Sequence, residues 1–211
     1  MTQNKPQKDY LAEPVRDFIA ATAARTPTPG GGSVAGVVGA LAAALGEMSL
    51  NYTRGKKKFA AHEEHYAQVA PRLARARGMF EDLVADDVAA YELYCKATAM
   101  PDGDEKDAAV QVALAASIDV PREAAKLALA LLGDLQGLAD KCSRWLVSDL
   151  LAAAALAVAT VRLCDYTVRI NTPALDDAGQ AAELRESSAD DVKHAVRVHG
   201  QMERQLRETL P

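Results

Sequence analysis

Hydrophobic residues gather in two long stretches of the chain that carry no charge. The runs Val34–Gly46 and Leu150–Val161 contain no Asp, Glu, Lys or Arg. With their flanking residues they predict helices over about 34–52 and 148–171 that are apolar nearly all round and therefore buried on most sides. Each uncharged run is shorter than the ~20 residues that span a bilayer. We therefore expect core helices and no membrane association.

Four further segments show the periodicity of amphipathic helices. One is expected to begin at Pro14 and to turn Val15, Phe18 and Ile19 inward. Helical patterns continue over 59–100 and 105–142, where Pro71 and Pro121 predict a break or kink.

The end of the chain predicts one more helix. Thr172-Pro173 should end the second apolar helix, because a residue before proline disfavours the α region. The segment 177–210 is charged, and its sparse apolar side comprises Val192, Val196, Met202 and Leu206. The pattern thus predicts six or seven helices and no strand.

Composition supports one helical domain. Alanine supplies 43 of the 211 residues and aromatic residues only 5%, a mixture that favours helices over sheets. We expect an all-α, single-domain multihelical bundle over residues 9–211 with long central buried helices, after a flexible tail over residues 1–8. Gly36 and Gly39 in the first apolar helix would allow a neighbouring helix to approach closely.

Charge and cysteines suggest the setting of the protein. The net charge of −5 argues against nucleic acid as the main partner. Cys95, Cys142 and Cys164 are odd in number and far apart, as expected for free thiols in a reducing compartment. The polar N-terminus lacks the apolar core of a signal peptide. We therefore expect a cytoplasmic protein.

A glycine-rich turn opens the first apolar helix. Gly30, Gly31 and Gly32 are followed by Ser33, a candidate N-cap. A helix start with glycines can bind an anion through its free N–H groups. The alternative is a packing turn between two helices. Neither a Walker A loop nor a dinucleotide-binding fingerprint is present.

Several polar residues are candidates for chemistry. Asp86 and Asp87 are adjacent in an apolar helical stretch, so one can face solvent and the other the interior. An interior carboxylate suits general acid/base work. The alternative is a solvated helix face. Ser148 and Asp149 are equally compatible with a helix N-terminus, and Asn171 with a helix end.

Two other clusters are weaker signals. Lys56, Lys57 and Lys58 can bind a polyanion or simply lie on a solvated surface. His62 and His65 stand three residues apart with no third ligand at useful spacing, so no metal site is expected.

Taken together, these segments resemble the cyclodeaminase/cyclohydrolase family, which comprises the cyclodeaminase domain of formiminotransferase-cyclodeaminase and stand-alone methenyltetrahydrofolate cyclohydrolases. The resemblance covers about residues 10–175. It rests on Pro27–Ala35, Gly39-Ala40-Leu41, Thr53–Phe59, Asp87–Tyr91, Val120-Pro121, Ser148-Asp149 and Ile170-Asn171.

The resemblance implies an all-helical homodimer that acts on a tetrahydrofolate derivative, with Asp87 as the catalytic acid/base and no other cofactor. Gly30, Gly31, Gly32 and Ser33 would allow close approach of the substrate. Lys56, Lys57 and Lys58 would bind the carboxylates of a folate that carries a polyglutamate tail. Ser148, Asp149 and Asn171 would hydrogen-bond the pterin ring, and Tyr91 and Tyr52 are the expected stacking partners.

This chain departs from the family pattern at three places. Thr167 stands where the family often has Asn, Leu163 and Cys164 where it often has Gly and Ala, and Lys141–Trp145 lacks a frequent asparagine. Formimino and methenyl substrates therefore both stay open. The alternative is a non-catalytic helical dimer that binds folate or another anion.

Overall fold

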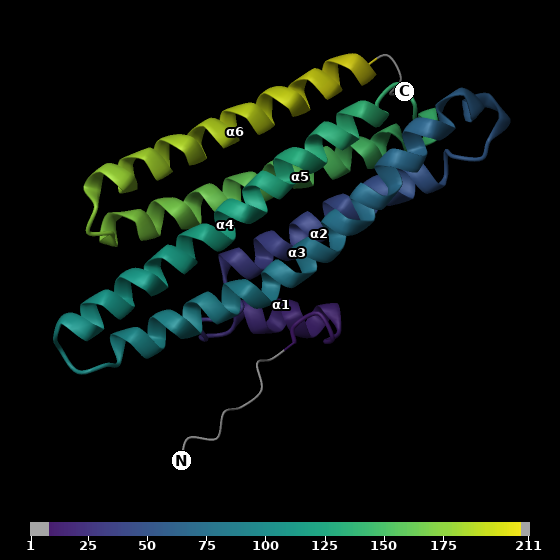
Figure 1. The fold of residues 1–211 in the computed structure, drawn as a ribbon. Helices are drawn as coiled ribbons and strands as arrows, with labels where there is room; N and C mark the ends of the chain where they lie inside the picture. Colours follow the sequence, from purple (N-terminus) through teal and green to yellow (C-terminus); the bar gives the residue numbers. More distant parts are fainter. Residues whose placement is uncertain (1–8, 208–211) are drawn as a thin grey trace.

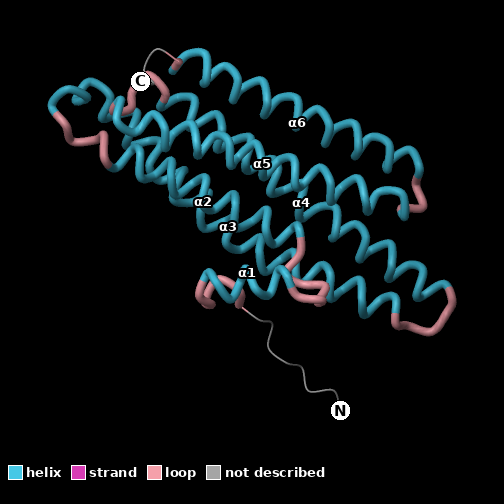
Figure 2. Tube along the Cα trace, turned by 180° about the vertical axis from the view of Figure 1, so that it is seen from behind, coloured by secondary structure: helices cyan, strands magenta, loops and turns pink. Residues whose placement is uncertain are grey.

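The computed structural model describes residues 9–207, which form α-helices and short 3₁₀ turns but no strand (Figures 1 and 2). The all-α prediction is confirmed. The expected tail over residues 1–8 and the end of the last predicted helix lie outside the described residues. The helices within residues 9–207 are α1 (Val15–Ala23), α2 (Gly31–Asn51), α3 (Glu63–Thr98), α4 (Asp104–Leu138), α5 (Val147–Asn171) and α6 (Ala178–Leu206).

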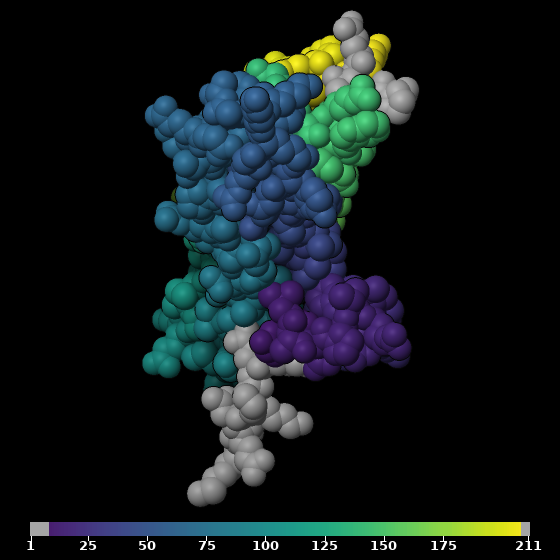
Figure 3. All heavy atoms as spheres, turned by 90° about the vertical axis from the view of Figure 1, so that its right-hand side faces the viewer, coloured from purple at the N-terminus to yellow at the C-terminus, as the bar shows by residue number. Residues whose placement is uncertain are grey.

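Helices α2 to α5 form a four-helix bundle in which each packs against two main neighbours. Helix α2 lies between α3 and α5, and α4 closes the ring on the opposite side. Helix α6 packs along α5 and α4 at the edge of the bundle (Figure 1). Short α1 lies outside the ring, and the space-filling view shows it projecting from the body (Figure 3).

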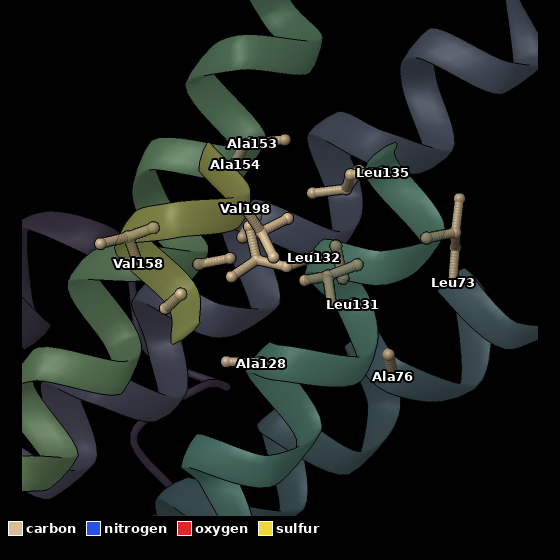
Figure 4. Close-up of a cluster of buried hydrophobic side chains, with 14 of the residues drawn as sticks. Leu73, Ala76, Ala128, Leu131, Leu132, Leu135, Ala153, Ala154, Val158 and Val198 are labelled. Atoms are coloured by element: carbon tan, nitrogen blue, oxygen red, sulfur yellow. The ribbon is translucent and has the colours of Figure 1, made fainter. Parts of the chain in front are cut away.

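Leucine and alanine dominate the core. Leu131, Leu132 and Leu135 of α4 meet Ala153 and Ala154 of α5, and all five are buried (Figure 4). Each buried leucine contributes roughly 1.5–3 kcal/mol relative to an exposed one. The alanines add less area, but they let α5 lie close to its neighbours.

Glycines bring α2 close to α3. A Cβ at Gly36 would lie 2.7 Å from Cγ2 of Val84, and one at Gly39 would lie 2.5 Å from Cδ1 of Phe80. Real Cβ atoms essentially never come that near another heavy atom. The expected close approach at Gly36 and Gly39 is therefore confirmed, and the helix that packs against these glycines is α3.

The predicted break at each proline is wrong, and a kink at either proline stays a prediction. Pro71 lies inside α3 and Pro121 inside α4, and both helices continue through them. A proline removes one hydrogen bond from a helix interior. Packing of α3 and α4 against their neighbours along the bundle outweighs that loss.

The first helix differs from its prediction. Pro14 is the N-cap of α1 rather than its first residue. Val15 is 75% and Ile19 60% exposed, so their expected inward orientation is wrong. Phe18 does pack, with its ring against that of Tyr10. The reason is that α1 touches the bundle along one narrow side only.

The last helix begins as predicted. The Asp177 side chain caps α6 by accepting a hydrogen bond from the Gln180 N–H at 2.9 Å. Met202 and Leu206 are buried, but Val196 is 41% exposed, which contradicts its place on the expected apolar side. Ala195 is the buried residue of that turn.

Two helical segments are long and apolar enough to cross a membrane. They are Gly31–Asn51 and Arg144–Ala174. Each of these helices extends well past its uncharged run, so the length of the run alone does not decide whether the helix could span a bilayer. Length and composition are weak indicators here, since buried core helices meet the same criterion.

The contact of α2 with α3 predicts opposite effects of two glycine substitutions. Gly39→Ala should destabilise the protein by about 1–3 kcal/mol, because the new methyl group collides with the buried ring of Phe80. Gly133→Ala in α4 meets nothing within 4 Å and should stabilise by up to about 1 kcal/mol through helix propensity. Urea unfolding measures both. Equal midpoints for the two variants would contradict the close contact.

Candidate functional site

A cavity of about 440 Å³ opens at the start of α2. Its walls come from the loop before α2, from α3, α4 and the end of α5. The lining residues are Pro27, Thr28, Gly30, Gly31, Gly32, Asp87, Ala90, Tyr91, Tyr94, Leu114, Ser117, Thr167, Ile170, Asn171 and Ala174. Half of the sequence-predicted site residues, from three distant segments, therefore meet in one place: Gly30, Gly31, Gly32, Asp87, Tyr91 and Asn171.

Asp87 is the carboxylate of this cavity. It lies on α3 and is half-buried, whereas its neighbour Asp86 is exposed. The expectation that one of the pair faces solvent and the other the interior is confirmed. The Ser33 hydroxyl donates a hydrogen bond of 2.7 Å to Oδ2 of Asp87.

Gly32 makes room for the Asp87 carboxylate. A Cβ on Gly32 would lie 1.9 Å from Oδ1 of Asp87 and 2.5 Å from its carboxyl carbon. The side chain of Asp87 thus occupies the space that any other residue at position 32 would fill. This close approach gives the third glycine of the turn a definite structural purpose.

Helix α2 begins at Gly31, three residues before its predicted start at Val34. Gly30 is the N-cap, and Ser33 is the third residue of the helix and fully buried. The first intrahelical bond runs from the Val34 N–H to the Gly30 carbonyl. The N–H groups of Gly31 and Gly32 therefore lack an acceptor within the helix, and they give this wall of the cavity a partial positive charge.

The end of α5 supplies a polar wall. The Asn171 amide donates to the Thr167 carbonyl at 2.9 Å, which leaves its side-chain oxygen as an acceptor. The Thr167 hydroxyl donates to the Leu163 carbonyl, within the helix.

Ser117 and Tyr94 are among the polar residues of the cavity that sequence reasoning missed. Ser117 belongs to α4, and its hydroxyl donates to the Ala113 carbonyl at 2.9 Å. A lone serine in the apolar stretch 113–118 is the signal that could have drawn attention to it. Tyr94 lies one helical turn after Tyr91, so the two rings share a face of α3.

Tyr91 lies at the cavity, as expected. A hydrogen bond with Cys95 raises the pKa of Tyr91, so its hydroxyl stays protonated and can donate at neutral pH. Its side chain is 38% exposed, which leaves part of the ring open to a ligand.

Cys164 lies behind the cavity. Burial, and then the negative charge of Asp87, raise the pKa of the Cys164 thiol to about 12. The thiol therefore stays neutral and acts as a small apolar group beside the carboxylate.

The remaining predicted site residues lie at the other end of the bundle. Lys56, Lys57 and Lys58 follow the end of α2, and the helix alone separates its two ends by about 30 Å. Ser148 and Asp149 belong to the first turn of α5. Tyr52 and Trp145 are exposed there, at 62% and 75%.

The Cys142 thiol also lies at this end of the bundle, beside Thr53. Burial raises the pKa of Cys142, a hydrogen bond from Thr53 lowers it, and Asp149 and Lys56 act on it with opposite signs. Asp149 and Lys56 are therefore neighbours of one thiol. Within one chain, the structure does not bring these residues to the cavity of Asp87.

Potential metal ligands do not cluster in the described part of the chain. Over residues 9–207 no three His, Cys, Asp or Glu side chains come together in a way that could hold a metal ion.

Comparison with known proteins shows clear relatives. The model of the family "Formiminotransferase-cyclodeaminase" matches residues 14–190. A methenyltetrahydrofolate cyclohydrolase of Methylorubrum extorquens is 33% identical, over 81% of this chain and 85% of the relative. A formimidoyltransferase-cyclodeaminase of Sus scrofa is 31% identical over 86% of this chain, which spans only 34% of that longer protein.

A solved structure has the same fold. The crystal structure of a formiminotetrahydrofolate cyclodeaminase from Thermotoga maritima superposes with a TM-score of 0.79. The two chains are 29% identical, and the match covers 94% of this chain and 96% of the other.

The environment of the three thiols predicts their order of reactivity. At pH 8, iodoacetamide should alkylate exposed Cys95, whereas Cys164 should react at least ~100-fold more slowly because its thiolate is scarce and inaccessible. Peptide mass spectrometry measures both rates. All three thiols should react in urea, and fast labelling of native Cys164 would contradict its placement.

Proposed function

The chain belongs to the formiminotransferase-cyclodeaminase family, and from this premise we propose that it is an enzyme of one-carbon tetrahydrofolate chemistry. Its reaction is that of a methenyltetrahydrofolate cyclohydrolase or a formimidoyltetrahydrofolate cyclodeaminase, with Asp87 as general acid/base. The names of the relatives support the folate substrate. We assign the acid/base role to Asp87 because this carboxylate lies in the wall of the cavity.

The geometry suits a cationic substrate. Methenyltetrahydrofolate carries a delocalised positive charge across N5 and N10, and a fixed carboxylate beside it stabilises that charge. Tyr91, Ser117 and Asn171 surround the same cavity. They provide donors and acceptors that suit the polar edge of a pterin.

Hydrolysis moves one proton through Asp87 and releases a second. Asp87 takes a proton from the water that attacks the methenyl carbon, and a C–O bond forms at that carbon. The bond from this carbon to one of the two nitrogens then breaks as Asp87 returns its proton to that nitrogen, and the remaining O–H proton passes to solvent as the formyl C=O forms.

Cyclodeamination uses the same group in the same two roles. N10 attacks the formimino carbon on N5, Asp87 accepts the N10 proton, and the departing ammonia receives it. Neither route includes a redox step, so the tetrahydrofolate derivative is the substrate and no second cofactor enters the proposed chemistry.

The family resemblance also leads us to propose a homodimer. Leu41 of α2 and Tyr166 and Ile170 of α5 are 54%, 63% and 78% exposed, on two helices that pack side by side. Monomers rarely leave large apolar patches uncovered. A second copy of the chain, with its α2 antiparallel to the first, would cover this face.

The dimer gives the far-end residues a place in the site. An antiparallel pair would carry Lys56, Lys57 and Lys58 of the partner subunit toward the cavity of Asp87. Three ammonium groups there would suit the carboxylates of a polyglutamate tail. The two cavities of the dimer would be equivalent by symmetry.

Replacing Asp87 tests the function. Asp87→Asn keeps the shape of the side chain but removes its proton chemistry, so kcat should fall about 10²- to 10⁴-fold. The decay of methenyltetrahydrofolate absorbance in the near-ultraviolet measures the cyclohydrolase reaction, and release of ammonia from formiminotetrahydrofolate measures the cyclodeaminase reaction.

The neighbouring carboxylate is the matched control. Asp86→Asn removes an exposed charge on the same helix turn and should leave kcat within about twofold of wild type, since surface changes are usually mild. Retained turnover in Asp87→Asn would refute the role of Asp87. A wild-type protein that turns over neither substrate would favour the alternative, a non-catalytic binding protein.

Charge reversal at Lys57 tests the tail and the dimer together. Lys57→Glu should raise KM for a polyglutamylated substrate several-fold more than for the monoglutamate, because only the former presents extra carboxylates. Equal effects on both substrates would remove the tail-binding role. Light scattering at assay concentration should give twice the chain mass, and a monomer with full activity would refute the dimer.

A further inference from the structure

Ser33 cannot contact a ligand in the cavity, although it directly follows the glycines that line it. Its exposed fraction is 0%, and it is absent from the cavity wall. The binding role expected for it therefore does not fit. It does not cap α2 either, because Gly30 takes that position.

The Ser33 side chain is directed at Asp87. Its hydroxyl donates to Oδ2 of Asp87 at 2.7 Å, across 54 residues of sequence, and so joins α2 to α3. Hydrogen bonds to a carboxylate are roughly twice as strong as those between neutral groups. A buried position strengthens such a bond further, because little water competes for either partner.

The two oxygens of Asp87 have different surroundings. Oδ2 is occupied by the Ser33 hydroxyl, whereas Oδ1 lies over Gly32, where a Cβ would be only 1.9 Å away. Gly32 lines the cavity and Ser33 does not. Oδ1 therefore lies against a residue that lines the cavity, whereas Oδ2 is bound by one that does not.

We propose that Ser33 is a positioning residue that holds Oδ2 of Asp87 and leaves Oδ1 to exchange the proton with the substrate. This inference rests on the proposed function of Asp87. The last torsion of an aspartate side chain has broad minima, so without Ser33 the carboxylate rotates and Oδ1 loses its fixed direction. A displacement of about 1 Å at a reacting group can cost ~100-fold in rate.

The test compares two buried hydroxyls of the same helix. Ser33→Ala removes the bond to Asp87. Ser49→Ala removes a hydroxyl that is also 0% exposed but has no hydrogen-bond partner among the described residues. Ser33→Ala should lower kcat about 10- to 100-fold with KM changed less than threefold, whereas Ser49→Ala should leave kcat unchanged.

A stability cycle tests the contact without any turnover. Ser33→Ala, Asp87→Ala and the double variant are unfolded in urea. Because the two side chains share one hydrogen bond, the double variant should shift the midpoint by less than the sum of the single shifts. Additive shifts would overturn the inference.

The kinetic outcomes separate the alternatives. An unchanged kcat in Ser33→Ala, or a raised KM with unchanged kcat, would overturn the positioning role. A wild-type protein inert toward both folate substrates would refute the proposed function instead, while the cycle would still report the contact. If Ser33→Ala does not fold, Ser33→Cys keeps a weak donor, and its kcat should fall below that of wild type; full activity there would overturn the proposal.

Discussion

The close approach of α2 to α3 is the constraint on which both the bundle and the cavity depend. Gly32, Gly36 and Gly39 are spaced four and three residues apart, so they share one face of α2. Opposite them, in reverse order along α3, lie Asp87, Val84 and Phe80. Gly36 and Gly39 therefore let α2 pack closely on α3, and Gly32 leaves the space that the Asp87 carboxylate occupies.

This arrangement explains how a carboxylate is tolerated beside an apolar core. Asp87 lies next to the start of α2, where free N–H groups and the helix dipole favour negative charge, and it accepts a hydrogen bond from Ser33. Behind it, the neutral Cys164 thiol completes the packing. The helix start thus stabilises the folded protein and prepares the group that the proposed reaction uses.

Much of the fold follows from the hydrophobic pattern, and the errors have physical causes. The uncharged runs predicted α2 and α5, and the charged amphipathic segment 177–210 predicted the start of α6. The helix breaks predicted at the two prolines are wrong, because tertiary packing stabilises a helix despite the loss of one hydrogen bond. The prediction of Ser33 as the N-cap of α2 is wrong, because Gly30, whose backbone is extended, takes that position instead.

The candidate site likewise contains residues that the sequence predicts and residues that it does not. Residues at a helix start or in a paired motif, such as Gly32, Asp87 and Asn171, could be predicted. Ser117 stands out as a lone serine in an apolar stretch, but the sequence does not fix how α4 is rotated toward the cavity.

The order of motifs along a sequence does not say which helix ends lie together in space. Helices α2 and α5 are antiparallel neighbours, since the start of one and the end of the other line one cavity. Lys56 and Asp149 must then lie together at the opposite end, about 30 Å away along α2. No motion within one chain could close that distance without breaking the helix. In the homodimer proposed above, a second copy of the chain would bring these residues to the cavity and would cover the exposed apolar side chains Leu41, Tyr166 and Ile170 of α2 and α5.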